Sequence, residues 1–125
     1  MRTPHPTLTP QELAIMKVVW RLDKATVRDV YEALRDARPV AYTTVMTMMK
    51  ILEVKGHLKK ARVERAYVYT PSRPRQQVVG AMVRDFVERV FDGATAGLLL
   101  HLAKDRRLSK EERQRIRRAI DEMED

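Results

Sequence analysis

The sequence predicts a mainly α-helical protein with one small β-hairpin. Apolar residues recur with a helical period of about 3.6 before residue 56 and again after residue 75. Between these regions the period changes to 2, which is typical of strands. Pro71 and Pro74, with Ser72 between them, indicate a linker. We therefore expect two domains, one of helices and the hairpin over residues 1–72 and a helical one over residues 73–125.

Composition and charge limit the classes of function that the protein can have. The chain has 125 residues, 44% of them hydrophobic and none of them cysteine, which suits a globular protein and excludes disulfides and thiolate metal sites. It has no apolar stretch of about 18 residues and no signal-peptide pattern, so we expect a cytoplasmic protein. Of the net charge of +8, residues 1–73 carry +7, from 14 Lys or Arg and 7 Asp or Glu. A basic N-terminal part favours a polyanionic partner.

Capping signals begin the first two predicted helices. Thr9 is the expected N-cap of a helix over 10–21, with Pro10 at its first position and Glu12 as capping-box partner. A second helix is expected to start at Thr26. Its apolar positions follow the i, i+3, i+4, i+7 pattern and are Val27, Val30, Tyr31 and Leu34.

The third predicted helix has an unusual polar face. We expect a brief strand over 40–42, an N-cap at Thr43 and a C-terminal stop at Gly56. The core-facing stripe is Val45, Met48, Met49 and Leu52. A merely solvated opposite face would favour Glu, Lys, Gln and Ala. This chain instead has Thr43, Thr44, Met46, Thr47, Lys50 and Ile51 there.

The period of 2 after Gly56 predicts a hairpin with strands around 58–62 and 66–70. The tip, Val63-Glu64-Arg65, lacks Asn-Gly, so we expect a loop rather than a two-residue turn. Further helices are expected over 76–91, over 98–104 and from Ser109, where Glu112 completes a second capping box.

Three helices followed by a hairpin form the layout of a winged helix-turn-helix, in which the third helix enters the major groove and the hairpin, or wing, follows the phosphates. Threonine offers base edges both a hydroxyl and a methyl group. We expect Thr44 and Thr47 to read bases and the basic residues to contact phosphates. The predicted DNA-binding residues are Thr43, Thr44, Met46, Thr47, Lys50, Lys55, Lys60, Arg62 and Arg65.

Two other interpretations remain open. The third helix could bind a protein partner through Met46, Ile51 and Val54, or the chain could be a nonspecific nucleoid-type DNA binder. Tyr67 and Tyr69 are interpreted as hairpin packing residues rather than base contacts. The histidines are scattered and no glycine-rich phosphate loop is present, so we expect no catalysis, no metal, no cofactor and no small-molecule substrate.

The C-terminal part has more apolar residues than about fifty residues in three helices can bury. A second copy of the chain is the simplest partner, so we expect a homodimer. The predicted dimerisation residues are Val79, Met82, Val83, Phe86, Val90, Phe91, Leu99, Leu102, Ile116 and Ile120.

The stretches LTPQELAIMKVVW, AYTTVMTMMKILEVKGHL and AYVYTP, in this order, resemble the penicillinase-repressor group of bacterial transcription factors, the BlaI/MecI/CopY family. The VFDG segment and the helices after it are similar to the family's dimerisation region. The resemblance implies a homodimeric winged-helix repressor that binds a dyad operator of double-stranded DNA, occluding promoters of β-lactam-resistance-type or related genes.

Three departures from the family pattern affect what the resemblance implies. The copper-responsive branch has a cysteine-rich tail that binds metal, and this chain has no cysteine. Ile51 stands where the family often has Arg, which removes one expected DNA contact. In the β-lactam branch a membrane sensor protease cuts an Asn-Phe bond, and His101-Leu102 stands at that place here.

Overall fold

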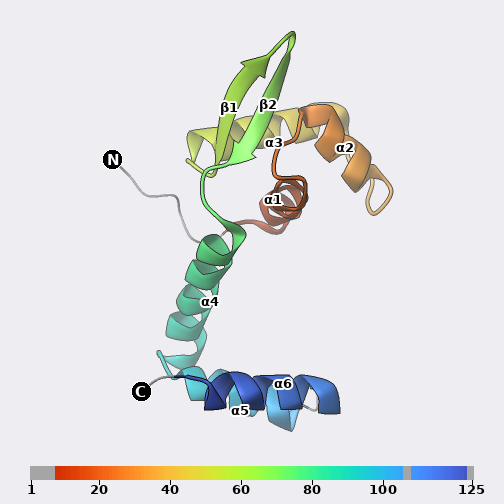
Figure 1. Cartoon of the computed structure of the whole chain (residues 1–125). Coiled ribbons are helices and arrows are strands. Elements are labelled where there is room, and N and C mark those ends of the chain that lie inside the picture. Colours follow the sequence, from red (N-terminus) through yellow and green to blue (C-terminus); the bar gives the residue numbers. More distant parts are fainter. Residues whose placement is uncertain (1–7, 106–107, 124–125) are drawn as a thin grey trace. The chain divides into compact units, whose positions relative to one another are not determined.

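The computed structural model describes residues 8–105 and 108–123. These residues contain six helices and one antiparallel hairpin, which confirms the expected mainly α fold (Figure 1). The elements are α1 (Pro10–Leu22), α2 (Val27–Arg35), α3 (Tyr42–Val54), β1 (Leu58–Val63), β2 (Ala66–Pro71), α4 (Arg75–Phe91), α5 (Thr95–Lys104) and α6 (Lys110–Asp121).

The start of α1 is the predicted capping box. The Thr9 N–H donates to Glu12 Oε1 at 2.9 Å, and the Glu12 N–H donates to Thr9 Oγ1 at 3.1 Å. The box at Ser109 of α6 is confirmed as well. A further box, not predicted, begins α2, where Asp29 takes the place of the usual Glu or Gln opposite Thr26.

The start of α3 differs from the prediction. The helix begins at Tyr42 with Ala41 as N-cap, and no side chain caps it. Thr43 was therefore wrongly predicted as the cap, because it already lies inside the first turn, where it is exposed. The brief strand expected over 40–42 is also wrong. Ala25 instead pairs with Tyr69 of β2 through N–H···O bonds of 2.9 and 2.8 Å.

The end of α3 follows the prediction at Gly56. Its φ is +90°, its N–H donates to the Glu53 carbonyl at 3.0 Å, and the His57 N–H donates to the Leu52 carbonyl at 2.9 Å. This pair of bonds is a Schellman motif, which needs the left-handed conformation that glycine adopts without strain.

The hairpin turn is shorter than expected. Val63 pairs with Ala66, so only Glu64 and Arg65 form the turn. The expectation of a longer loop was wrong because Glu64 adopts a φ of +57° without glycine or asparagine. Successive side chains along each strand point to opposite faces of the hairpin. One face of the hairpin carries Leu58, Lys60, Arg62, Tyr67 and Tyr69, and the other carries Lys59, Ala61, Val63, Ala66, Val68 and Thr70.

One hydrophobic core joins α1, α2, α3 and the base of the hairpin. The hairpin contacts α3 through β1 (Figure 1). Its largest fully buried side chains are Ile15, Met16, Val19, Val30, Val45, Met49, Leu52 and Leu58. Val78 and Met82 of α4 also pack on this core, and the chain divides into two compact units between Val83 and Arg84. That division lies beyond the junction expected at residues 72 and 73, within α4. In the described residues no helix is long and apolar enough to span a membrane.

Candidate nucleic-acid interface

The packing of α3 determines which of its residues face outward. Val45, Met49 and Leu52 have no exposed surface, so this stripe is held firmly against the core. A helix buried along one stripe presents the opposite side to solvent. The structure accordingly exposes all six residues of the predicted outer face: Thr43, Thr44, Met46, Thr47, Lys50 and Ile51.

Aromatic and basic residues of α2 surround the start of α3. The Tyr31 and Tyr42 rings meet edge to face at 5.6 Å between centroids, and Arg28 Cζ lies 5.7 Å from the Tyr42 centroid. Arg28 also pairs with Glu32, four residues later, at 3.5 Å. This packing places a guanidinium beside the first turn of α3. Arg28 is not among the predicted DNA-binding residues, although its place in the first turn of the helix that precedes the groove-reading helix is a usable signal.

The wing carries cations on the same face as an exposed aromatic ring. Lys60 Nζ lies 4.6 Å and Arg62 Cζ 6.0 Å from the centroid of Tyr67. Lys60 Nζ is also 3.5 Å from Glu53 Oε1 of α3, so it links the wing to that helix. Tyr69 is buried as predicted, and burial raises the pKa of its hydroxyl. Tyr67 stays 49% exposed beneath the two cations.

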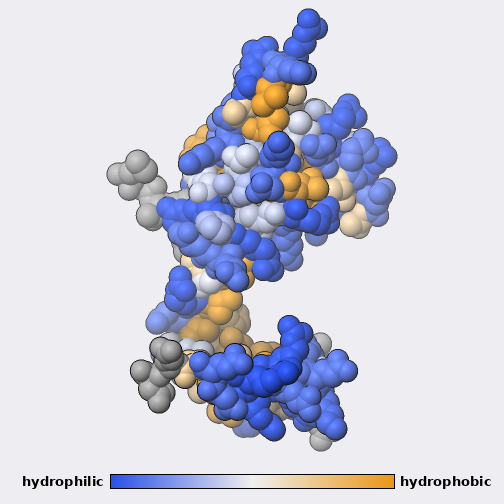
Figure 2. Space-filling view, viewed as in Figure 1, coloured by the Kyte–Doolittle hydropathy of each residue, from blue (hydrophilic) through white to orange (hydrophobic). Residues whose placement is uncertain are grey.

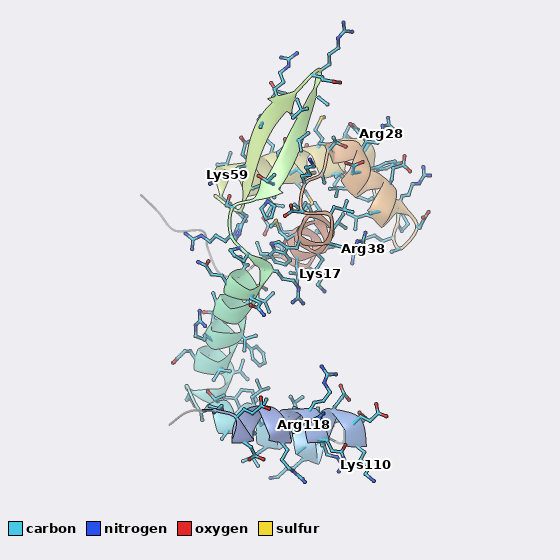
Figure 3. All side chains as sticks on the ribbon, in the orientation of Figure 1. Lys17, Arg28, Arg38, Lys59, Lys110 and Arg118 are labelled. Atoms are coloured by element: carbon cyan, nitrogen blue, oxygen red, sulfur yellow. The ribbon has the colours of Figure 1, made fainter. Side chains whose placement is uncertain are left out.

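Basic side chains occur near both ends of α3. Arg28 lies beside the start of the helix and Lys59 beside its end, at the base of β1 (Figure 3). Lys50 and Arg65, both predicted phosphate contacts, are exposed on the middle of α3 and in the hairpin turn. Residues from α2, α3 and the wing thus contribute positive charge around the threonine face.

Lys55, another predicted phosphate contact, is placed differently. Its Nζ lies 2.6 Å from Glu12 Oε2, and the Glu12 side chain is only 4% exposed. Burial acts to raise the pKa of Glu12, but hydrogen bonds from Lys55 and Thr9 outweigh it and lower that pKa. The structure therefore brings Lys55 into an ion pair inside the domain.

The predicted dimerisation residues fall into two groups. Half-buried in the single chain are Val79, Met82, Phe91, Leu102 and Ile116. Between 40% and 53% exposed are Val83, Phe86, Val90, Leu99 and Ile120. Hydrophobic surface is visible over α4 in Figure 2.

A groove between α5 and α6 adds to the apolar surface of the second unit. Its volume is about 280 Å³, and its walls are Leu99, Leu100, Ala103, Leu108, Arg113, Ile116, Arg117 and Ile120. The His101-Leu102 bond, which stands where the β-lactam branch of the family has its cleaved bond, lies within α5, with an exposed His101 and a half-buried Leu102.

A three-helix domain in which α3 exposes threonines beside a basic hairpin is typical of a winged-helix DNA-binding protein. Comparison with known families makes the assignment more specific. The family model of the penicillinase repressor matches residues 8–122. The chain belongs to the penicillinase repressor family.

Two relatives illustrate the likeness. The chain is 36% identical over 115 residues to the transcriptional regulator BlaI of Mycobacterium tuberculosis, covering 90% of this chain and 82% of the relative. It is 26% identical over 117 residues to the penicillinase repressor of Bacillus licheniformis, covering 94% and 91%. These relatives are transcriptional regulators rather than enzymes, in agreement with the sequence-based expectation.

Solved structures agree with the fold over part of the chain. The solution structure of the DNA-binding domain of the repressor BlaI matches with a TM-score of 0.53 and 28% identity, over 59% of this chain and 90% of that one. The monomeric form of Bacillus licheniformis BlaI, solved in complex with the blaP half-operator, matches with a TM-score of 0.52 and 28% identity, over 60% and 92%. The winged-helix architecture is thereby confirmed.

Proposed function

We propose that this protein is a homodimeric, sequence-specific transcriptional repressor that binds a dyad operator, in genes of the β-lactam-resistance type or related ones. The observation that carries the proposal is the threonine face of α3, exposed opposite a fully buried stripe and flanked by basic residues. The family membership and the half-operator complex of a relative support it.

In this proposal α3 lies in the major groove and the wing follows the backbone. Thr44 and Thr47 contact base edges, while Lys50, Arg62 and Arg65 fix the register on phosphates. Met46 and Ile51 meet thymine methyl groups. Two copies place their α3 helices about 34 Å apart, on half-sites one helical turn from each other. Bound to the promoter, the dimer blocks transcription, and its place of action is the cytoplasm, where bacterial DNA lies.

The apolar surface of the second unit supports the pairing of two copies. Phe86 and Val90 of α4 and Ile120 of α6 expose large side chains that a partner copy would cover. Isolated exposed apolar residues are ordinary on a protein surface, but a stripe on α4 together with an open apolar groove is typical of an interface.

Selection of binding sites from random duplex DNA tests the proposal. We expect enrichment of one sequence repeated as a dyad. Equal recovery of all sequences would instead indicate a nonspecific nucleoid-type binder. An affinity for DNA no higher than that of any basic protein, together with salt-insensitive capture of a protein through Met46, Ile51 and Val54, would indicate an interaction module.

Release from the operator by a membrane sensor protease forms the second part of the proposal. A cut between His101 and Leu102 would separate α6 from the rest of the chain and weaken pairing. Immunoblots of cells before and after induction test this step. Recovery of only the intact chain while its target genes are expressed would contradict it.

A further inference from the structure

Glu12 joins the beginning of α1 to the end of α3. Its Oε1 accepts the Thr9 N–H at 2.9 Å, and its Oε2 accepts from Lys55 Nζ at 2.6 Å. Lys55 is the C-cap residue of α3, 43 positions away in the sequence. One carboxylate therefore completes a capping box and fixes the far end of the helix that is proposed to read DNA.

The partners of this ion pair differ in exposure. The Lys55 side chain is 42% exposed, whereas the Glu12 side chain is 4% exposed. If Lys55 turned away to bind a phosphate, it would leave a buried carboxylate without its cation. Removing one partner of a buried ion pair costs a large free energy because the remaining charge is uncompensated. Lys50 and Arg62 are exposed and carry no such penalty, since neither is joined to a buried carboxylate of the described residues.

The position of Lys55 at the C-terminus of α3 adds a second constraint. Its positive charge there is favourable beside the free carbonyl groups of the last turn. The Schellman bonds at Gly56 and His57 follow directly, so the backbone around Lys55 is well defined. The ion pair between Glu12 and Lys55 thus holds the end of α3 against α1. It thereby fixes the direction in which the threonine face points.

We propose that Glu12 is a positioning residue for operator recognition: it withholds Lys55 from the DNA backbone and fixes the end of α3. The inference rests on the proposed DNA-binding function. Its consequence is that operator binding depends on the threonine face and a limited set of cations. A freed Lys55 would add a phosphate contact that is the same on every sequence and would therefore reduce selectivity.

The salt dependence of DNA affinity distinguishes a cation that contacts phosphate from one that is kept away from the DNA. The slope of log K against log salt becomes steeper by about 0.9 for each additional phosphate that the protein neutralises. The measurement is made for the whole chain on the selected operator and on an unrelated duplex. The variants are Lys55→Ala, Glu12→Gln and the combination of both, with Lys50→Ala as a reference for a true phosphate contact.

We expect Lys55→Ala to leave the slope unchanged, although operator affinity falls because the end of α3 loosens. Glu12→Gln should steepen the slope by about 0.9 on both duplexes, which is about 3.5-fold more loss of affinity between about 50 and 200 mM salt. Adding Lys55→Ala to Glu12→Gln should remove that increment. The reference Lys50→Ala should flatten the slope.

Thr9→Ala is the matched control for stability. It removes the hydroxyl from the same capping box but keeps the pair between Glu12 and Lys55. It should lower the thermal midpoint without changing the slope. An equal change of slope in Thr9→Ala and Glu12→Gln would overturn the proposal, because the effect would then be one of helix fraying.

A flattening by Lys55→Ala as large as that of Lys50→Ala would also overturn the proposal, since Lys55 would then contact phosphate. This comparison decides the matter even if Glu12→Gln does not fold. Failure of the proposed function has a different signature. In that case the wild-type protein itself shows no preference for any operator, and Lys50→Ala does not change the slope.

Discussion

In the proposed interface the threonines of α3 are the residues that read bases. A threonine is short enough to let a helix sit deep in a groove, and its hydroxyl and methyl group suit different base edges. On an ordinary solvated helix face this residue would be a poor choice, because its branched Cβ lowers helix propensity. The exposure of Thr44 and Thr47 opposite the buried stripe of α3 therefore supports the proposed contact with DNA.

Thr47→Ala should reduce base preference. We expect discrimination at one base pair of the half-site to fall by about 0.5–1.5 kcal/mol, the worth of one neutral hydrogen bond, with little change in binding to unrelated DNA. Affinities for the operator and for single-base variants measure this. Thr70→Ala, at an exposed position of β2, is the control and should leave the preference intact. Uniform weakening on all sequences would contradict a base contact by Thr47.

Glu12 gives a pH-dependent contribution to stability. Its pKa is lowered in the folded state, so its contribution is present above its ordinary value of 4.5 and is lost as the pH falls through the folded-state pKa. Glu12→Gln should therefore be less stable than wild type near neutral pH, and the two should converge in acid. Urea unfolding at several pH values measures the difference, and a gap that does not change with pH would contradict this account.

Among the elements, the end of α3 depends on one glycine. Gly56 has a φ of +90°, and side chains with a Cβ pay about 1–2 kcal/mol to adopt the left-handed region. Gly56→Ala should destabilise the domain by about that amount, measured by urea unfolding. Gly80→Ala is the control: this glycine lies inside α4, where alanine is the better helix former, so it should not destabilise. Equal losses would show that the left-handed conformation is not the cause.

The two faces of the wing give a matched pair of cations. Arg62 shares the face of Tyr67, whereas Lys59 lies on the other face of β1. A strand cannot present both faces to one phosphate backbone. Arg62→Ala should flatten the salt slope by about 1, as should Lys50→Ala, while Lys59→Ala should change it little. An unchanged slope for both Lys50→Ala and Arg62→Ala would remove them from the interface.

Across the molecule as a whole, the two units differ in how many hydrophobic side chains they bury. The unit that ends at Val83 encloses its core around α1, α2 and α3. The unit that begins at Arg84 leaves apolar side chains of α4, α5 and α6 exposed. Short helices have too little interior to bury such residues alone, and in the proposed dimer a second copy covers them.

Phe86→Ser and Ile120→Ser should weaken dimerisation. These side chains are 41% and 50% exposed in the single chain, so their loss should affect pairing more than folding. Sedimentation velocity should show a shift toward monomer, and binding to a full dyad should weaken more than binding to a half-site. Val54→Ser, at an 83% exposed position of α3, is the control and should leave the dimer intact. A wild-type protein that is monomeric at working concentrations would contradict the proposed assembly.

Local signals in the sequence were sufficient for most elements. Thr9 and Glu12 began α1, Thr26 preceded α2, and Gly56 ended α3, because capping and left-handed stops depend on side chains within a few residues. The stripe of α3 that packs inward also followed from helical spacing. The outward face of that helix followed in turn, since a stripe and its opposite face are not independent.

Predictions that depended on distant partners were the weaker ones. The segment over 40–42, expected as a brief strand, forms none, whereas Ala25, which was not expected to pair, forms a bridge with the distant Tyr69. The turn at Glu64 adopts a conformation that its residue type does not favour, so turn composition was misleading. Arg28 was overlooked because its position beside Tyr42 arises from the packing of α2 on α3.

The order of elements, the face of α3 that meets solvent and the family all follow from the sequence alone, because they depend on residue type and short-range spacing. Which cations are free became clear only in the folded chain. Lys50, Lys55 and Arg62 carry the same charge, and the sequence alone does not distinguish their roles. In the structure, Lys55 alone of these three is paired with the buried carboxylate of Glu12. That pairing depends on how the end of α3 packs against the beginning of α1, and such a contact has no local signature.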